Sequence, residues 1–85
     1  MHKFYIKKPA DTAGTLKSVE KDIKKEGGKF SGSEQSGSFG NPEGNVTCSY
    51  ITRTNDIEIT ITKKPFIYPN SAVEAKIREY FAKYI

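Results

Sequence analysis

Two neighbouring stretches in which apolar and polar side chains alternate constrain the fold more than any other feature of the sequence. The stretches are Val46-Thr47-Cys48-Ser49-Tyr50-Ile51 and Ile57-Glu58-Ile59-Thr60-Ile61-Thr62. Successive side chains of a β-strand point to opposite faces of a sheet, so each stretch gives a strand with one apolar and one polar face. Thr54-Asn55-Asp56 lies between them and is typical of a short turn. The pattern therefore predicts a hairpin of an antiparallel sheet that is covered on one face.

The segment before this hairpin is rich in Gly and Ser. Residues 29–45 contain only two large apolar side chains, Phe30 and Phe39. A loop of that length without regular structure is uncommon in a compact domain. We therefore expect weak, solvated strands at residues 30–33 and 36–39.

Two segments have the spacing of amphipathic helices. From about residue 14 to residue 26 a narrow apolar stripe recurs at helical intervals, and either Thr12 or Thr15 is expected as its N-cap. In the last segment, Ser71 and Glu74 are predicted to form a capping box at the start of a helix. The wider apolar face of this helix, which we expect to supply much of the core, consists of Val73, Ile77, Tyr80, Phe81 and Tyr84.

A strand at residues 3–7, in which Phe4 and Ile6 share one face, completes the predicted elements. Their order is strand, helix, strand, an optional strand, two further strands and helix. Amphipathic helices and a one-sided sheet bury their apolar faces most economically in two layers. We therefore predict a single α+β domain over residues 1–85, with a mostly antiparallel sheet of four or five strands and two amphipathic helices packed on one face.

The residue types argue against catalysis. The 85 residues include one cysteine, Cys48, and one histidine, His2, which we expect in a frayed terminus. This leaves no metal-ligand spacing and no Cys–His or Ser–His nucleophile. Asp56 and Glu58 share a strand face, but they lie near a turn without an apolar pocket to hold one of them protonated. The Gly-rich residues match no phosphate-binding motif, so we expect no enzyme, no cofactor and no metal.

The lone thiol favours a reducing compartment, and the sequence shows neither an apolar signal core nor a run of membrane-spanning length. We therefore expect a cytoplasmic protein.

The net charge of +4 is unevenly distributed, because residues 1–30 and 63–85 are positive and residues 31–62 are acidic. One predicted helix face carries Lys17, Lys21, Lys24 and Lys25. Such a face can contact nucleic-acid phosphates without sequence preference, and this is the alternative function to be weighed. The outer sheet face carries mainly Thr, Ser and Glu instead of an aromatic ladder for stacking bases. Solvated helix charge is therefore the simpler interpretation.

Three bulky side chains, Phe66, Ile67 and Tyr68, lie between two prolines and directly follow two lysines. An apolar projection beside positive charge suits a hydrophobic surface or a protein partner. In the alternative arrangement, Phe66 and Tyr68 fold over the open edge of the core and cap the last helix. Our leading hypothesis is a small non-catalytic domain that binds through Lys63, Lys64, Phe66, Ile67 and Tyr68.

Several motifs follow an N-terminal strand, a helix and a Gly-containing weak strand in a fixed order. They are Gly44-Asn45-Val46-Thr47-Cys48-Ser49-Tyr50, Ile57-Glu58-Ile59-Thr60-Ile61, Pro65-Phe66 and Ala72-Val73-Glu74-Ala75-Lys76-Ile77-Arg78-Glu79-Tyr80-Phe81. This layout resembles the small polyhydroxyalkanoic acid system proteins of bacteria in order and spacing over most of the chain, with identity at few positions. The resemblance implies a small non-enzymatic protein linked to storage granules, and it supplies no catalytic residues.

Overall fold

The computed structural model describes residues 2–84, whose strands form one antiparallel sheet. Strand β1 (His2–Lys7) lies at one edge and pairs with β5 (Asp56–Lys63), the last strand along the chain. The strands β2 (Lys29–Gly32), β3 (Ser36–Gly40) and β4 (Thr47–Thr52) lead into β5 as a meander. The spatial order is therefore β1-β5-β4-β3-β2, and both weak strands expected in the Gly- and Ser-rich segment are present.

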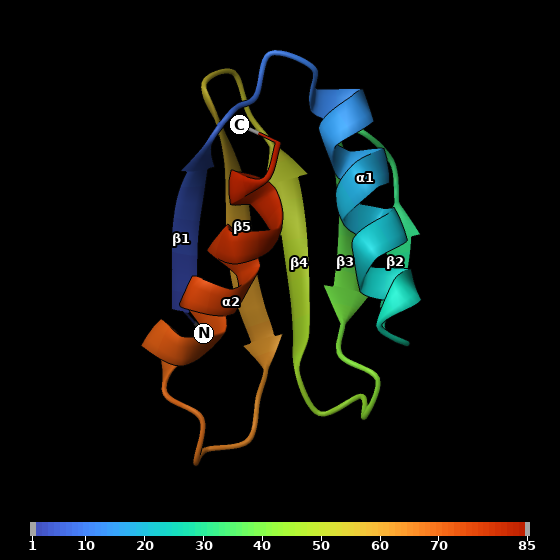
Figure 1. The fold of residues 1–85 in the computed structure, drawn as a ribbon. Helices are drawn as coiled ribbons and strands as arrows, with labels where there is room; N and C mark the ends of the chain where they lie inside the picture. The colour runs from blue at the N-terminus through green and yellow to red at the C-terminus, as the bar shows by residue number, and fades with distance from the viewer. Residues whose placement is uncertain (1, 85) are drawn as a thin grey trace.

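Both helices cover the same face of the sheet (Figure 1). Helix α1 (Thr12–Lys25) connects the edge strand β1 to the opposite edge strand and contacts β2. Helix α2 (Asn70–Ala82) follows β5 and contacts β1. The predicted α+β architecture, its element order and its five-stranded antiparallel sheet are confirmed.

The core lies between the two helices and the inner face of the sheet. At its centre Tyr50, Ile57 and Ile59 of the predicted hairpin are at most 1% exposed. The remaining buried apolar side chains are Phe4, Ile6, Leu16, Val19, Ile23, Phe30, Phe39, Cys48, Ile61, Val73, Ile77 and Phe81. Each strand thus buries the face that its alternation assigns to the core.

Helix α1 begins before residue 14, and neither predicted cap is its N-cap. The N-cap is Asp11, whose carboxylate accepts a hydrogen bond from the backbone N–H of Gly14 at 3.0 Å. Thr12 and Thr15 are buried inside the helix instead, and the Thr12 hydroxyl donates to the Pro9 carbonyl at 3.3 Å. A carboxylate accepts from the free N–H groups of the first turn and also complements the positive end of the helix dipole.

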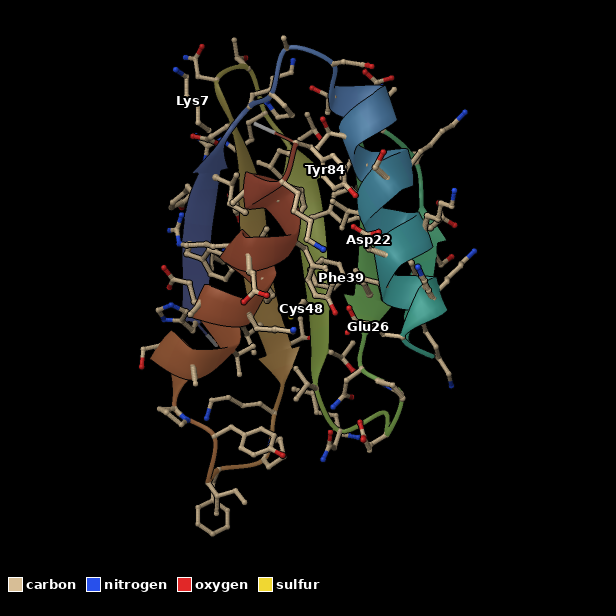
Figure 2. The ribbon with its side chains drawn as sticks, in the orientation of Figure 1. Lys7, Asp22, Glu26, Phe39, Cys48 and Tyr84 are labelled. Carbon is tan, nitrogen blue, oxygen red and sulfur yellow. The ribbon has the colours of Figure 1, made fainter. Side chains whose placement is uncertain are left out.

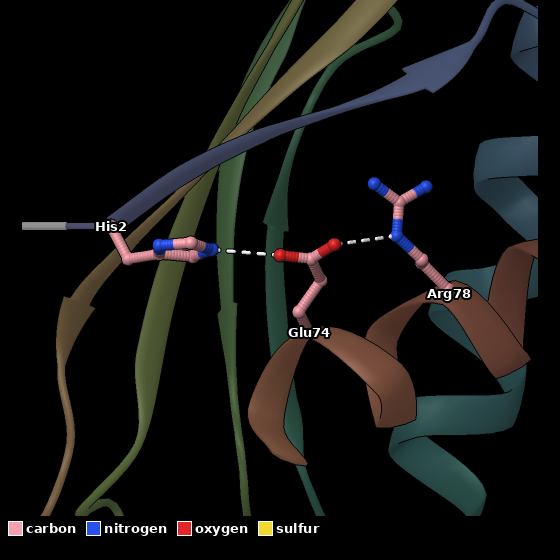
Figure 3. Close-up of polar contacts among 3 residues, drawn as sticks. All are labelled: His2, Glu74 and Arg78. Atoms are coloured by element: carbon pink, nitrogen blue, oxygen red, sulfur yellow. Dashed lines mark hydrogen bonds and ion pairs between the residues drawn. The ribbon is translucent and has the colours of Figure 1, made fainter. Parts of the chain in front are cut away.

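The predicted capping box of α2 is also wrong. The helix begins at Asn70, and Pro69 occupies the N-cap position without a side-chain hydrogen bond. Glu74 is held elsewhere, because its two carboxylate oxygens contact His2 Nε2 at 2.7 Å and Arg78 Nε at 2.8 Å (Figure 3). His2 therefore belongs to β1 and does not lie in a frayed terminus.

The buried face of α2 is narrower than its sequence indicates. Val73, Ile77 and Phe81 are buried, whereas Tyr80 is half-buried and Tyr84 is 37% exposed. A tyrosine hydroxyl needs a polar partner, and both of these hydroxyls find a carboxylate on the α1 side instead of entering the core.

Candidate functional site

The connection between β5 and α2 carries the two most exposed large apolar side chains of residues 2–84, Phe66 and Ile67, and a third exposed one, Tyr68. Phe66 is 93% exposed, Ile67 69% and Tyr68 44%. The backbone N–H of Tyr68 donates to the Pro65 carbonyl at 3.1 Å, so the connection makes a tight turn. Phe66 does not fold over the edge of the core, which was the alternative arrangement for this segment.

The two lysines predicted to act with this connection lie at its start. Lys63 is the last residue of β5 and is exposed, and Lys64 follows it and is half-buried. All five residues predicted to bind a partner are therefore adjacent at one end of the molecule, where apolar side chains and positive charge meet.

A second apolar feature, a groove of about 370 Å³, opens between the two helices. Phe39 and Cys48 form its floor, and Ile23 of α1 and Ile77 of α2 form its walls. Figure 2 shows Phe39 and Cys48 in the space between the helices. Most of the lining is carbon, as is usual for sites that bind apolar groups.

One wall of the groove lies at the end of α1, because Ile23, Glu26 and Gly28 line it. The helix ends at Lys25, and Gly27, with a φ of +90°, turns the chain back toward β2. Glycine adopts this left-handed conformation without steric cost. The groove therefore lies between this end of α1 and helix α2, over residues of β3 and β4.

Polar contacts bridge the two helices next to the groove. The Tyr80 hydroxyl donates to Glu26 Oε1 at 2.7 Å. The Tyr84 hydroxyl donates to Asp22 Oδ2 at 2.5 Å, and Figure 2 labels these two residues. Lys83 Nζ lies 3.8 Å from the same Asp22 oxygen. Burial and the neighbouring Glu26 carboxylate raise the pKa of Tyr80 above its usual range, so this hydroxyl remains a donor at neutral pH.

The groove and the exposed connection form one continuous surface, because Tyr68 belongs to both. The turn between β3 and β4, whose Asn41 and Pro42 also line the groove, lies at the same end of the molecule as the β5–α2 connection (Figure 1). We call residues 63–69 together with the groove the end surface.

Cys48, at the floor of the groove, is not placed for nucleophilic chemistry. Its side chain is 1% exposed. Burial raises the pKa of its thiol to about 12, so the thiolate that would react is scarce at neutral pH.

The four lysines predicted to contact phosphates share the outer surface of α1. Lys17, Lys21, Lys24 and Lys25 are all exposed. Lys24 Nζ forms an ion pair with Glu20 at 2.6 Å, which reduces the positive charge of this face. The face lies on the side of α1 away from the core and is separate from the end surface.

The two carboxylates of β5, Asp56 and Glu58, form ion pairs with basic side chains. Arg53 lies 3.3 Å from oxygens of both Asp56 and Glu58, and Lys3 Nζ lies 3.3 Å from Glu58.

Residues 2–84 contain no group of three or more His, Cys, Asp or Glu side chains that could hold a metal ion. The same residues include no helix with the length and apolar character that crossing a membrane requires.

The groove was not predicted from the sequence, because its lining comes from both helices, two strands and three connections. The nearest sequence signal is Gly27-Gly28, which predicts the helix end beside which the groove lies. Comparisons of the chain with protein-family models, with curated proteins and with solved structures found no match.

Proposed function

We propose that this protein is a non-catalytic binding module that docks through the end surface onto an apolar partner surface carrying negative charge. The observation that carries the proposal is the 93% exposure of Phe66 next to two further exposed apolar side chains. A large apolar side chain held in water has an unfavourable free energy of hydration, which burial in a complex relieves. The granule-associated role implied by the family resemblance is compatible with such docking.

Lys63 and Lys64 are the reason that we propose a negatively charged partner surface. Neither residue has an ion-pair partner within 4 Å among residues 2–84. Positive side chains beside an apolar contact attract a negatively charged surface and orient the approach to it.

Sulfate-modified polystyrene particles offer an apolar, negatively charged surface that tests this proposal. Phe66→Ser/Ile67→Ser should weaken particle binding by at least about tenfold, since two apolar side chains leave the contact. The matched control Tyr5→Ser/Ile51→Ser removes an aromatic side chain and an isoleucine that are also exposed, but on the uncovered sheet face. Its affinity should stay close to that of the wild type. Equal losses in both double variants would contradict the proposal.

The charge contribution needs a separate variant. Lys63→Gln/Lys64→Gln should bind the particles more weakly than the wild type at low salt, and the difference should shrink as salt screens the charges. Lys17→Gln/Lys21→Gln, which changes the outer surface of α1, should bind like the wild type. If the α1 variant lost more affinity than the Lys63/Lys64 variant, the phosphate-contacting alternative would be favoured.

A further inference from the structure

We propose that the partner bound by the end surface is a second copy of this chain, arranged so that the exposed loop of each copy enters the groove of the other. This inference rests on the proposed function, because it requires the end surface to be the docking surface. It adds the identity of the partner and the symmetry of the complex.

The shapes of the two features are complementary. Phe66 and Ile67 form a projection, and the groove beside them is an apolar hollow of about 370 Å³. Ligand pockets begin at about 300 Å³, so the groove has room for the side chains at the tip of a loop. The loop cannot fill its own groove in this way, because Tyr68 already occupies the near wall while Phe66 points away.

The charges next to the two features are opposite on balance. Lys63 and Lys64 accompany the projection. The groove is lined by Glu26 and by Lys76, and Glu43 follows Pro42, another lining residue, so two carboxylates and one ammonium group lie beside the groove. A second copy would place the two lysines of one chain beside these carboxylates of the other. Such complementarity favours this pairing over association with a surface of unrelated charge pattern.

The position of the two features suits a two-fold axis. The loop and the turn beside the groove lie at the same end of the molecule (Figure 1). When a projection and a hollow lie side by side on one surface, an axis that passes between them brings each projection onto the hollow of the other copy. The contact then forms twice and closes, so the expected assembly is a dimer and not a fibre.

Sedimentation of the full chain over about 1 to 500 μM, the range where weak complexes dissociate, tests this proposal. The wild type should pass from monomer to dimer. Phe66→Ser removes the projection, and Ala72→Trp fills the groove from an exposed position of α2. Each should raise the dissociation constant by at least about tenfold. The control Ala75→Trp lies on the same helix outside the groove and should dimerise like the wild type.

A mixture of the two weakened variants tests the two-fold arrangement itself. Phe66→Ser keeps an intact groove and Ala72→Trp keeps an intact projection, so a mixed pair regains one of the two contacts. The mixture should associate more tightly than either variant alone. Glu43→Lys should weaken the wild-type dimer by about twofold to fivefold, as loss of an exposed ion pair does.

The outcomes distinguish this inference from the proposed function. A wild type that stays monomeric at all concentrations, but binds polystyrene particles through Phe66 and Ile67, overturns the dimer and leaves the docking function intact. A dimer that tolerates both Phe66→Ser and Ala72→Trp also overturns the inference. If the chain neither dimerises nor binds particles through this loop, both proposals fail.

Discussion

Tyr50 accounts for two of the glycines in the segment that looked least structured in the sequence. Its ring is 1% exposed beneath β2 and β3. A Cβ added to Gly37 would lie 2.7 Å from the Tyr50 ring, and one added to Gly32 would lie 2.8 Å from its hydroxyl oxygen. That hydroxyl donates to the Ser33 carbonyl, which fixes the ring under the two strands. Backbone atoms come equally close, because the Cβ at Gly32 would lie 2.4 Å from Gly37 Cα and the Cβ at Gly37 would lie 2.6 Å from the Ser31 carbonyl oxygen. Both glycines are therefore required by the close packing of the two strands on each other and on Tyr50.

The Gly37→Ala variant tests this packing. The added methyl group would also approach the Ser31 carbonyl oxygen to 2.6 Å, so the strand or the ring must shift. We expect a loss of about 1–3 kcal/mol in the free energy of unfolding, as for other overpacked cores. Urea denaturation measures it, with Ser38→Ala on the exposed face of the same strand as the control. Equal stability of the two variants would show that Tyr50 lies elsewhere.

Cys48 provides a second test at the residue scale. With a pKa of about 12, the buried thiol is ionised in only about 1 in 10,000 molecules at pH 8. We expect the folded protein to react very slowly with 5,5′-dithiobis(2-nitrobenzoate), and the unfolded protein to react at once. Rapid labelling of the folded chain would contradict the burial of this residue at the floor of the groove.

Among the elements, local periodicity was sufficient to predict the hairpin and both helices, whereas the weak strands were predicted because a structureless loop of seventeen residues is uncommon. Alternation and helical spacing are properties of neighbouring residues, so they can be recognised in the sequence without knowledge of the fold. The N-caps of both helices were predicted wrongly because several polar side chains compete for the same contacts. Asp11 displaced the threonines at the start of α1, and Glu74 is engaged by His2, a residue distant in the sequence. The groove depends on how the two helices are placed relative to each other over the sheet, which no local pattern records.

Helix α2 is attached to the core mainly through Phe81, Val73 and Ile77. Phe81 is 1% exposed, so Phe81→Ala should cost about 3–5 kcal/mol in the free energy of unfolding. Tyr84→Ala, which changes an exposed residue just after the end of α2, should cost clearly less. Thermal and urea denaturation measure both, and a loss below about 1 kcal/mol for Phe81→Ala would show that another face of the helix is buried.

The contact between β1 and α2 makes stability depend on pH. Hydrogen bonds from His2 and Arg78 hold the pKa of Glu74 below its usual value. A carboxylate with a lowered pKa in the folded state stabilises the fold above its unfolded pKa of about 4.3, and this contribution is lost as the pH falls through the folded pKa. We expect Glu74→Gln to be less stable than the wild type at pH 6. The difference should shrink in acid, and a constant difference down to pH 3 would contradict this role.

In the whole molecule, the positive segments of the chain lie at both edges of the sheet. β1 pairs with β5 and contacts α2, whereas α1 with its lysines contacts β2 at the opposite edge. The net charge of +4 alone suggests a polyanionic partner. The distribution of this charge along the chain places Lys63 and Lys64 next to the exposed loop. The proposed docking uses these two residues.

Hydrogen exchange of the chain bound to sulfate-modified polystyrene particles locates the surface through which this protein meets its partner, which we propose is the end surface. Docking buries the contacting segments and slows exchange of their backbone amides. We predict added protection confined to residues 64–73 and to the β3–β4 turn at residues 41–46. Protection that instead appears on the outer surface of α1, or on the uncovered face of the sheet, would contradict the account.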